Sequence, residues 1–326
     1  TAPAVVFKSE AIVHPDEVLK YIAKDECQLS YNPLLMALIW ESLATRNTQL
    51  LSQSMRKSFA ISPDCAWVNY VRCHDDIGWT FDDDVAQQLG INGHDHRQFL
   101  NQFYTGRFAG SFASGVAFAE NPSNGDCRVC GSLASLAGLE KAIQTNNPQH
   151  IQHAVARILM IHSIILSIGG VPLLYSGDEL GLLNDYSYQQ DNSKQHDDRW
   201  VHRIGLTTQA IEQANHPQSA QYAISQGLKR LINLRQDHTV FGQSATTIVD
   251  TNNAHVFAFS RHNETGEHLL VLCNFSENPQ RLNSQILHSL ATQACKNIIN
   301  EQLLKTHDLH IEMQPYEAMW LVNHDQ

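Results

Sequence analysis

Apolar and polar residues alternate over positions 1–76, and again over 151–238, in the way expected for strands followed by helices. A short apolar run at 5–7 ends in Lys8, Ser9 and Glu10, which is typical of a buried parallel strand with a functional C-terminal end. Asn32 and Pro33 precede apolar residues at helical spacing and predict a capped helix reaching Leu43. Further strands are expected at 27–31, 66–71 and 171–175, and further helices at 14–21, 151–168 and 219–235.

Two regions break this alternation. Residues 77–150 are rich in glycine, asparagine, aspartate and aromatic residues and are too long for an ordinary loop, so we expect an inserted subdomain there. From residue 239 onward, short apolar runs at 255–259, 268–272 and 319–322 are separated by turn residues, which predicts an all-β module.

Acidic residues at successive strand ends suit a (β/α)₈ barrel, in which catalytic groups come from several strand ends on one face. Only four barrel strands are predicted, whereas the complete barrel needs roughly 250 residues. We therefore expect an α/β fold: half of a (β/α)₈ TIM barrel with an inserted subdomain, followed by a C-terminal all-β sandwich domain. The expected divisions are 1–76 for the first barrel strands and their helices, 77–150 for the insertion, 151–238 for the end of the barrel and 239–326 for the β-sandwich.

Composition excludes several classes of protein. Lys and Arg number 22 against 33 Asp and Glu, so the net charge of −11 argues against nucleic-acid binding. The most apolar stretch, 158–175, is interrupted by polar residues, glycines and a proline and does not read as a membrane span. Seven scattered cysteines predict reduced thiols, and the pair Cys127 and Cys130 lacks the second ligand pair of a zinc site. The first residues lack the pattern of a secretory signal and an initiator methionine, so we expect a chain that starts within a longer protein and leave the compartment open.

The candidate chemistry lies at the strand ends. Glu10 is a general acid if burial raises its pKa, or otherwise a solvated loop carboxylate. His74, Asp75 and Asp76 crowd one strand end, where cation binding is an alternative, although adjacent side chains on extended backbone point to opposite sides. Retaining glycosidic chemistry needs two carboxyl groups about 5–5.5 Å apart, and Glu10 and Asp75 are candidates whose separation the sequence does not fix.

Several motifs together resemble one known family. Phe7 to Pro15 reads FKSEAIVHP, and Trp67 to Phe81 reads WVNYVRCHDDIGWTF. These and the motifs at 95–101, 121–129, 175–181, 197–203 and 314–321 are similar to those of amylosucrases, in the α-amylase superfamily (glycoside hydrolase family thirteen). The resemblance covers nearly the whole chain, and it implies the second half of the barrel, with strands five to seven in 1–76 and strand eight after the insertion. The His-Asp pair alone would indicate only the superfamily.

The resemblance also implies roles for the candidate residues. Glu10 is similar to the general acid/base, Asp75 to the aspartate that stabilises the transition state, and His74 to the histidine that holds glucose hydroxyls. Asp76 resembles one partner of an ion pair that closes the sucrose pocket, with its arginine expected upstream of this chain.

Three arginines complete the implied site. Arg199 resembles the arginine near the fructosyl ring, whereas Arg97 and Arg128 resemble arginines that line the acceptor-glucan subsites. Without the resemblance, a surface ion pair is the simpler interpretation of each arginine.

The implied activity is transfer of glucose from sucrose to the 4-hydroxyl of an α-1,4-glucan with release of fructose, in two displacements and without cofactor or metal. The family's nucleophilic aspartate, in an Arg-x-Asp-Ala motif, is missing before Glu10. A retaining enzyme needs that carboxylate for its covalent intermediate. We therefore expect the chain alone to be inactive and to require the N-terminal half of the barrel, as a second chain or as the rest of a longer product.

Two alternatives remain open from the sequence. A sucrose hydrolase would share the same motifs, although Arg97 and Arg128 favour the transferase. A non-catalytic glucan-binding protein would use tryptophans such as Trp67, Trp79 and Trp200 to stack on sugars, although tryptophans on strands are more often part of the core.

Overall fold

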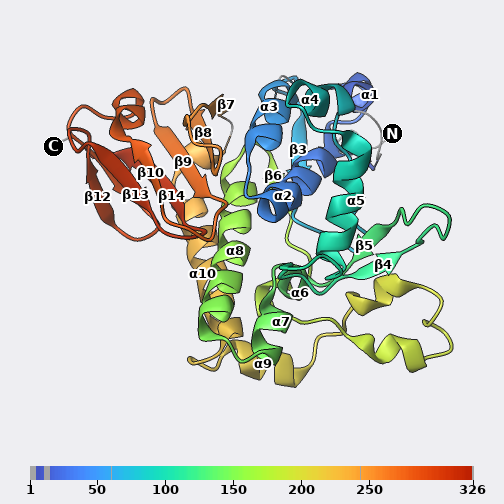
Figure 1. Cartoon of the computed structure of the whole chain (residues 1–326). Helices are drawn as coiled ribbons and strands as arrows, with labels where there is room; N and C mark the ends of the chain where they lie inside the picture. Colours follow the sequence, from blue (N-terminus) through green and yellow to red (C-terminus); the bar gives the residue numbers. More distant parts are fainter. Residues whose placement is uncertain (1–4, 11–14, 60, 243, 325–326) are drawn as a thin grey trace.

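The computed structural model describes residues 5–10, 15–59, 61–242 and 244–324. Its first part is built on a four-stranded parallel sheet in the order β1-β2-β3-β6. The strands are β1 (Lys8–Ser9), β2 (Leu29–Tyr31), β3 (Ala66–Asn69) and β6 (Val171–Pro172). In this sheet β1 pairs with β2, β2 with β3 and β3 with β6, so β1 and β6 form its two edges. Figure 1 labels β3 and β6 of this sheet.

The helices of this part follow the predicted pattern. Helices α1 (Pro15–Tyr21) and α2 (Pro33–Thr45) follow the first two strands, and the predicted start of α1 at His14 lies outside the described residues. The side chain of Asn32 accepts a hydrogen bond from the Leu35 N–H, which satisfies one of the free amides at the start of α2. The sequence interpretation missed α3 (Gln49–Ser58), a mainly polar helix that follows α2 after a short turn.

The two edge strands differ from their predictions. The run at 5–7, predicted as a buried strand, is exposed: Val5, Val6 and Phe7 are 52%, 58% and 60% exposed, and pairing with β2 begins only at Lys8. The strand predicted at 171–175 is limited to Val171–Pro172, and Val171 is 47% exposed. Each of these strands has a neighbour in the sheet on one side only.

Residues 77–150 contain the helices α4 (Asp83–Gln88), α5 (Gly93–Tyr104), α6 (Leu133–Leu136) and α7 (Leu139–Gln144), and the hairpin of β4 (Val116–Phe118) and β5 (Arg128–Cys130). Their apolar side chains do not form a separate core. Trp79 and Phe103 are buried in the same cluster as Trp40 and Leu43 of α2. The predicted insertion therefore packs directly on the barrel helices.

The barrel part ends with two long helices joined by a polar loop region. Helix α8 (Pro148–Ser167) precedes β6. Helix α10 (Ala220–Asp237) is capped by Ser219 and packs against α8. Between them lie α9 (Thr208–Ala214) and the short 3₁₀ turns η1 (Asp178–Leu180), η2 (Tyr186–Gln190) and η3 (Asp198–Val201); η4 (Thr239–Phe241) follows α10. None of the helices within the described ranges is both long and apolar enough to cross a membrane.

The C-terminal part is a six-stranded antiparallel sheet beside a two-stranded sheet. The larger sheet runs β12 (Gln302–Lys305), β11 (Ala294–Asn297), β14 (Ala318–Asn323), β9 (His268–Asn274), β8 (Val256–His262) and β7 (Ala245–Val249). The smaller sheet pairs β10 (Gln280–Asn283) with β13 (His310–Met313), and the turn η5 (Ser284–Ser289) follows β10.

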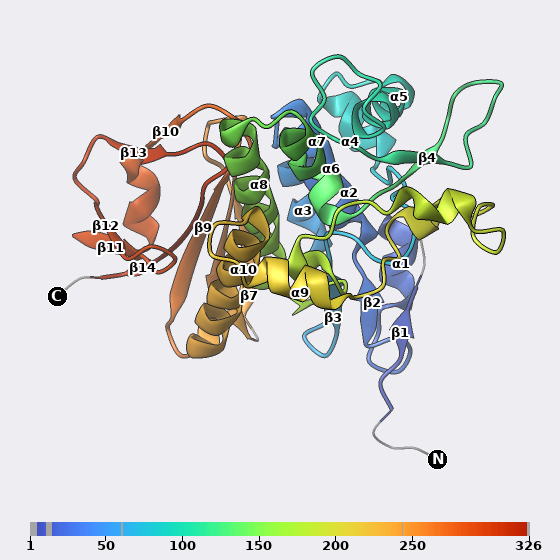
Figure 2. The ribbon, with the colours of Figure 1, turned by 90° about the horizontal axis from the view of Figure 1, so that it is seen from below.

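Successive residues of β8 serve two different cores. Phe257 and Phe259 belong to the large cluster that includes α8, whereas Val256 and Ala258 pack in a cluster with residues of β10 and β13. Helices α8 and α10 thus lie between the six-stranded sheet and the parallel sheet (Figure 2). This arrangement joins the two parts of the chain through a continuous apolar interior.

A buried arginine fixes the same junction. Arg261 of β8 is 0% exposed and donates to the carbonyl oxygens of Ser167, Gly242 and Ser244 over 2.7, 2.8 and 3.2 Å. Burial lowers the pKa of Arg261 to about 10. Ser167 is the last residue of α8, so the cation also lies at the negative end of that helix.

Candidate active site

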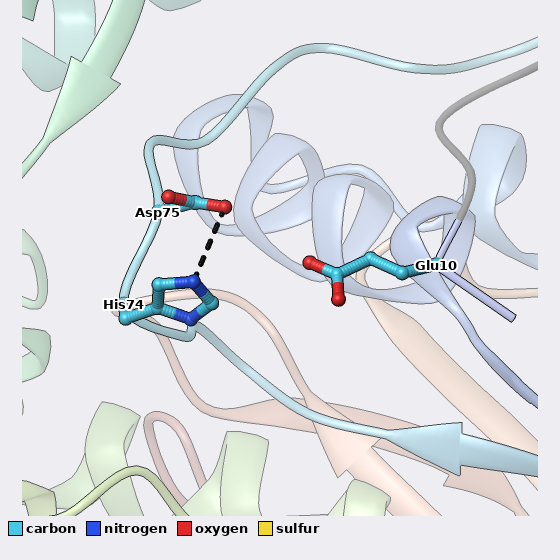
Figure 3. A group of neighbouring side chains, drawn as sticks. All are labelled: Glu10, His74 and Asp75. Atoms are coloured by element: carbon cyan, nitrogen blue, oxygen red, sulfur yellow. Dashed lines mark ion pairs between the residues drawn. The ribbon is translucent and has the colours of Figure 1, made fainter. Parts of the chain in front are cut away.

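Glu10, His74 and Asp75 come together at the C-terminal ends of β1 and β3. One carboxylate oxygen of Glu10, one of Asp75 and a ring nitrogen of His74 lie within 4.8 Å of one another. Figure 3 shows the Glu10 side chain pointing from the end of β1 toward the other two, which lie on the loop after β3. His74 Nε2 is 3.5 Å from Asp75 Oδ2. These side chains come close together because the strands of a parallel sheet all have their C-terminal ends on the same side of the sheet.

A pocket lies beside this cluster. Its wall contains Glu10, Asp75 and Asp76, together with Tyr31, Tyr70, Arg72 and Thr80. Glu10 and His74 are exposed, and Asp75 is half-buried. The two carboxyl groups that the sequence singled out therefore line the same small, mainly apolar pocket.

Two arginines hold the Asp75 carboxylate. Arg199 Nη1 and Arg203 Nη2 lie 3.1 and 3.2 Å from Asp75 Oδ1. Both guanidinium groups also contact Asp197, and the hydrogen bond from Arg199 lowers the pKa of that carboxyl. Donors such as Glu10, His74 and Asp75 also suit a divalent cation, but two guanidinium groups already balance the charge of Asp75.

The backbone of His74 is held by the neighbouring loop. Its carbonyl oxygen accepts hydrogen bonds from Arg203 Nε over 2.8 Å and from His202 Nε2 over 3.1 Å. The Gly131 N–H donates to His202 Nδ1 over 3.0 Å, so the ring proton of His202 is on Nε2. Burial, with the nearby Arg72 cation, lowers the pKa of His202 to about 3 and keeps the ring neutral.

Arg72 is buried beneath the loops that carry His74 and His202. It donates to the carbonyl oxygens of Gly131 and His202, each over 3.2 Å, and its guanidinium carbon lies 4.3 Å from the centre of the Tyr175 ring. Its Nη1 is 3.6 Å from Asp178 Oδ1. Burial raises the pKa of Asp178 to about 7, and the Arg72 cation opposes that shift.

Asp76 has a partner other than the one expected. The resemblance implied an arginine upstream of this chain, but Asp76 Oδ2 lies 3.0 Å from Nε of Arg128, on β5 downstream. Ile77 and Val129 exchange backbone hydrogen bonds of 2.8 and 3.0 Å, which brings the hairpin beside the loop that carries Asp76. The expected upstream arginine is not part of this chain and stays a prediction, whereas Arg128 lies closer to the cluster than the sequence alone indicated.

Arg97 lies apart from the cluster. Its guanidinium group donates to the carbonyl oxygens of Trp79 and Phe81, each over 3.1 Å, and pairs with Asp83 over 2.9 Å. These contacts fasten α5 to the loop after Gly78. In the present arrangement Arg97 thus has a structural role, and its implied place in an acceptor subsite stays a prediction.

Sequence reasoning missed Arg72, His202 and Arg203. Arg203 lies just after the turn η3, which begins with Asp198 and Arg199, and belongs to the same motif at 197–203. His202 and Arg72 gave no signal, because their partners are backbone groups far away in the sequence. Trp67 and Trp79 are buried, as expected for core residues, and Trp200 is half-buried.

Comparisons with known proteins agree with this description. Residues 247–322 match the family model of the amylosucrase C-terminal domain. Over 98% of its length the chain is 25% identical to glucosylglycerate phosphorylase of Escherichia coli (strain K12), of which it covers 53%. The chain thus spans about half the length of this curated relative.

Solved structures give the same fold. The crystal structure of AmyP E221Q in complex with maltotriose matches with a TM-score of 0.61 and 12% identity, over 97% of this chain and 55% of that one. Sucrose 6F-phosphate phosphorylase from Thermoanaerobacter thermosaccharolyticum matches with a TM-score of 0.58 and 15% identity, over 83% of this chain and 46% of that one.

The fold is therefore that of α-amylase-type proteins: part of a (β/α)₈ barrel followed by a β domain. The family model, the curated relative and the solved structures together make this chain similar to proteins of the α-amylase superfamily. Within that class, the C-terminal domain is similar to that of amylosucrases.

Proposed function

We propose that this chain carries the acid/base half of a retaining glucosyltransferase that moves glucose from sucrose to the 4-hydroxyl of an α-1,4-glucan. The observation that carries the proposal is that atoms of Glu10, His74 and Asp75 lie within 4.8 Å of one another, beside a small pocket that Glu10 and Asp75 line. The amylosucrase-like C-terminal domain favours sucrose as donor, as do the motifs around these residues.

The chemistry divides into two displacements. In the first, Glu10 gives its proton to the glycosidic oxygen of sucrose, the bond from that oxygen to glucose C1 breaks, and fructose leaves as a carboxylate attacks C1. In the second, Glu10 takes the proton of the acceptor hydroxyl, whose oxygen attacks C1 and breaks the ester. Asp75 and His74 bind the ring hydroxyls, and these contacts tighten as the ring flattens in the transition state.

The carboxylate that attacks C1 would come from the N-terminal half of the barrel. We propose that the N-terminal half of a barrel, as a separate chain or as the rest of a longer product, pairs with the open edges β1 and β6. The exposed apolar side chains of Val5, Val6, Phe7 and Val171 support this interface. They give the edges of the sheet an apolar surface that four further strands would cover.

A phosphorylase is the second candidate, favoured by a specific observation. Two of the similar proteins described above are phosphorylases, in which phosphate takes the place of the acceptor hydroxyl. Arg199 and Arg203 would attract such an anion, although both already bind Asp75 and Asp197. The sucrose hydrolase and the non-catalytic glucan-binding protein are further alternatives, which the same experiment separates.

The test is a sucrose incubation of the complete enzyme, with and without phosphate and glucan. Fructose in excess of glucose, with growing glucan, is the expected result. Equal amounts of fructose and glucose would indicate the hydrolase, glucose 1-phosphate the phosphorylase, and glucan binding without turnover the binding protein. Turnover of sucrose by the pure 36.6 kDa chain would contradict the two-component proposal.

Replacing the acid identifies the residue responsible. Glu10→Gln should lower the rate of fructose release about 10²- to 10⁴-fold, because the amide N–H is not acidic enough to protonate the leaving oxygen. Glu17→Gln is the matched control, since it makes the same chemical change on the exposed surface of α1. Equal loss in both variants would show an effect on folding rather than on the acid.

A further inference from the structure

The ring of Phe118 lies near the guanidinium groups of two arginines, each of which pairs with a different aspartate. The guanidinium carbon of Arg128 is 5.3 Å from the centre of the Phe118 ring, and that of Arg199 is 5.1 Å from it. Arg128 pairs with Asp76, and Arg199 pairs with Asp75. One aromatic side chain thus joins the ion pairs of two neighbouring carboxylates.

The position of Phe118 is fixed by the hairpin and by the loop beyond it. Phe118 of β4 is directly opposite Arg128 of β5 in the antiparallel register, which places the two side chains on the same face. Phe118 also packs against the cluster of Cys130, Tyr188 and Val201. The hydrogen bonds between Ile77 and Val129 hold the hairpin against the active-site loop. The ring is therefore held in place independently of either arginine.

The contact of each arginine is electrostatic as well as apolar. Both distances fall within the roughly 6 Å over which a cation is attracted to the face of an aromatic ring. The Arg128 side chain is 52% exposed and that of Arg199 is 31% exposed, so neither is held by burial. Phe118 is half-buried, and its ring shields both guanidinium groups from part of the solvent. The attraction between the ring and the two cations therefore restricts the positions of both guanidinium groups.

We propose that Phe118 is a positioning residue that keeps Arg128 on Asp76 and Arg199 on Asp75, and so sets the acceptor side of the pocket. The inference rests on the proposed function, since it concerns the choice between a glucan hydroxyl and water. Asp75 and Asp76 are adjacent, and without the ring the guanidinium group of Arg128 can move toward Asp75 or into solvent. That of Arg199 can turn away from Asp75 while it keeps its two hydrogen bonds to Asp197. A less ordered acceptor side would bind glucan more weakly while the donor side still cleaves sucrose.

The experiment separates the aromatic face from simple volume. Phe118→Leu keeps an apolar side chain without a ring, and Phe118→Trp keeps a ring. In the complete enzyme, Phe118→Leu should raise KM for the glucan acceptor and the share of glucose among the products about threefold to tenfold, with a smaller change in kcat for fructose release. Phe118→Trp should restore values near those of the unchanged enzyme. The control is Phe108→Leu, a phenylalanine that is 45% exposed and packs on Phe99.

Two results would overturn the inference. In the first, Phe118→Leu has the same KM for glucan and the same share of glucose as the unchanged enzyme. In the second, Phe118→Trp changes both quantities as much as Phe118→Leu does. A second measurement works on this chain without turnover. In nuclear magnetic resonance spectra, the Nε–H signals of Arg128 and Arg199, assigned with Arg128→Lys and Arg199→Lys, should both shift when the ring of Phe118 is removed. Lack of a shift in either signal also overturns the inference. An enzyme that releases no fructose from sucrose refutes the proposed function instead and leaves this second measurement valid.

Discussion

The imidazole of His202 donates a hydrogen bond from Nε2 to the carbonyl oxygen of His74 over 3.1 Å, although 128 residues separate the two in the sequence. Because Gly131 donates to the other ring nitrogen, His202 links the hairpin to the loop after β3. The side chains of His74 and Asp75 therefore stand on a loop whose backbone is held by hydrogen bonds from distant residues. A small set of loop contacts, rather than the strands themselves, gives the candidate site its shape.

Replacing His202 should loosen this site. His202→Leu removes both hydrogen bonds and leaves the buried Gly131 N–H without a partner, while the His74 carbonyl oxygen keeps its bond from Arg203. We therefore expect a loss of about 1–3 kcal/mol in the free energy of unfolding. His202→Gln offers one acceptor and one donor at similar positions and should retain most of the stability. Urea unfolding followed by circular dichroism measures both variants. Equal destabilisation by leucine and glutamine would show that ring packing, and not the hydrogen bonds, is responsible.

The stability of the chain should depend on pH through His202. Its folded pKa of about 3 lies below the ordinary value of about 6.5, so the stabilising neutral form is fully present above pH 6.5 and is lost as the pH falls toward 3. By linkage, one such histidine costs about 2 kcal/mol at pH 5 relative to pH 8.

Comparison with His202→Gln isolates this effect from that of other groups. His162, whose pKa burial lowers to about 4, acts in the same direction as His202. Asp178, with a pKa raised to about 7, acts in the opposite direction. From pH 8 to pH 5 the unchanged chain should lose about 2 kcal/mol more unfolding free energy than His202→Gln does. A constant difference would show that His202 is charged in the fold or already exposed.

Removing metal ions should leave the reaction unchanged. Asp75 already has two guanidinium groups within 3.2 Å, so a divalent cation beside it would meet like charge. We expect the rate of fructose release by the complete enzyme to be the same before and after dialysis against EDTA. Loss of activity that returns with Ca²⁺ or Mg²⁺ would assign the cluster of Glu10, His74 and Asp75 to a cation instead.

The junction between the barrel and the β domain should depend on Arg261. Arg261→Met leaves the carbonyl oxygens of Ser167, Gly242 and Ser244 without their donor, and we expect a loss of about 3 kcal/mol in unfolding free energy. The control is Arg281→Met, which removes the exposed pair with Glu312 in the same domain and should cost less than about 1 kcal/mol. Similar losses in the two variants would contradict a special role for the buried arginine.

The sequence predicted the helices better than the edge strands. Asn32 and Ser219 are caps that act within one turn, so α2 and α10 begin where the local pattern indicates. The apolar residues at 5–7 gave a false strand, because their exposure depends on which neighbours the sheet has.

The candidate site divides in the same way. Glu10 and Asp75 were predictable because each follows a strand of one parallel sheet. The pairing of Asp76 with Arg128 was not, because it depends on how the hairpin folds back on residue 77. Arg72 and His202 act on carbonyl groups of distant residues, a type of contact that the side-chain pattern does not record.

The alternation along β8 places a constraint on how this protein can vary. The segment 247–322, which matches a family module, sends Phe257 and Phe259 into the interior it shares with α8, and Val256 and Ala258 toward β10 and β13. A change of size on one face of the strand therefore has to be matched by α8, outside the module, and a change on the other face by residues within it. Among natural variants, the odd-numbered positions of β8 should co-vary with α8 and the even-numbered ones with β10 and β13, so the module and the barrel helix are inherited as one unit.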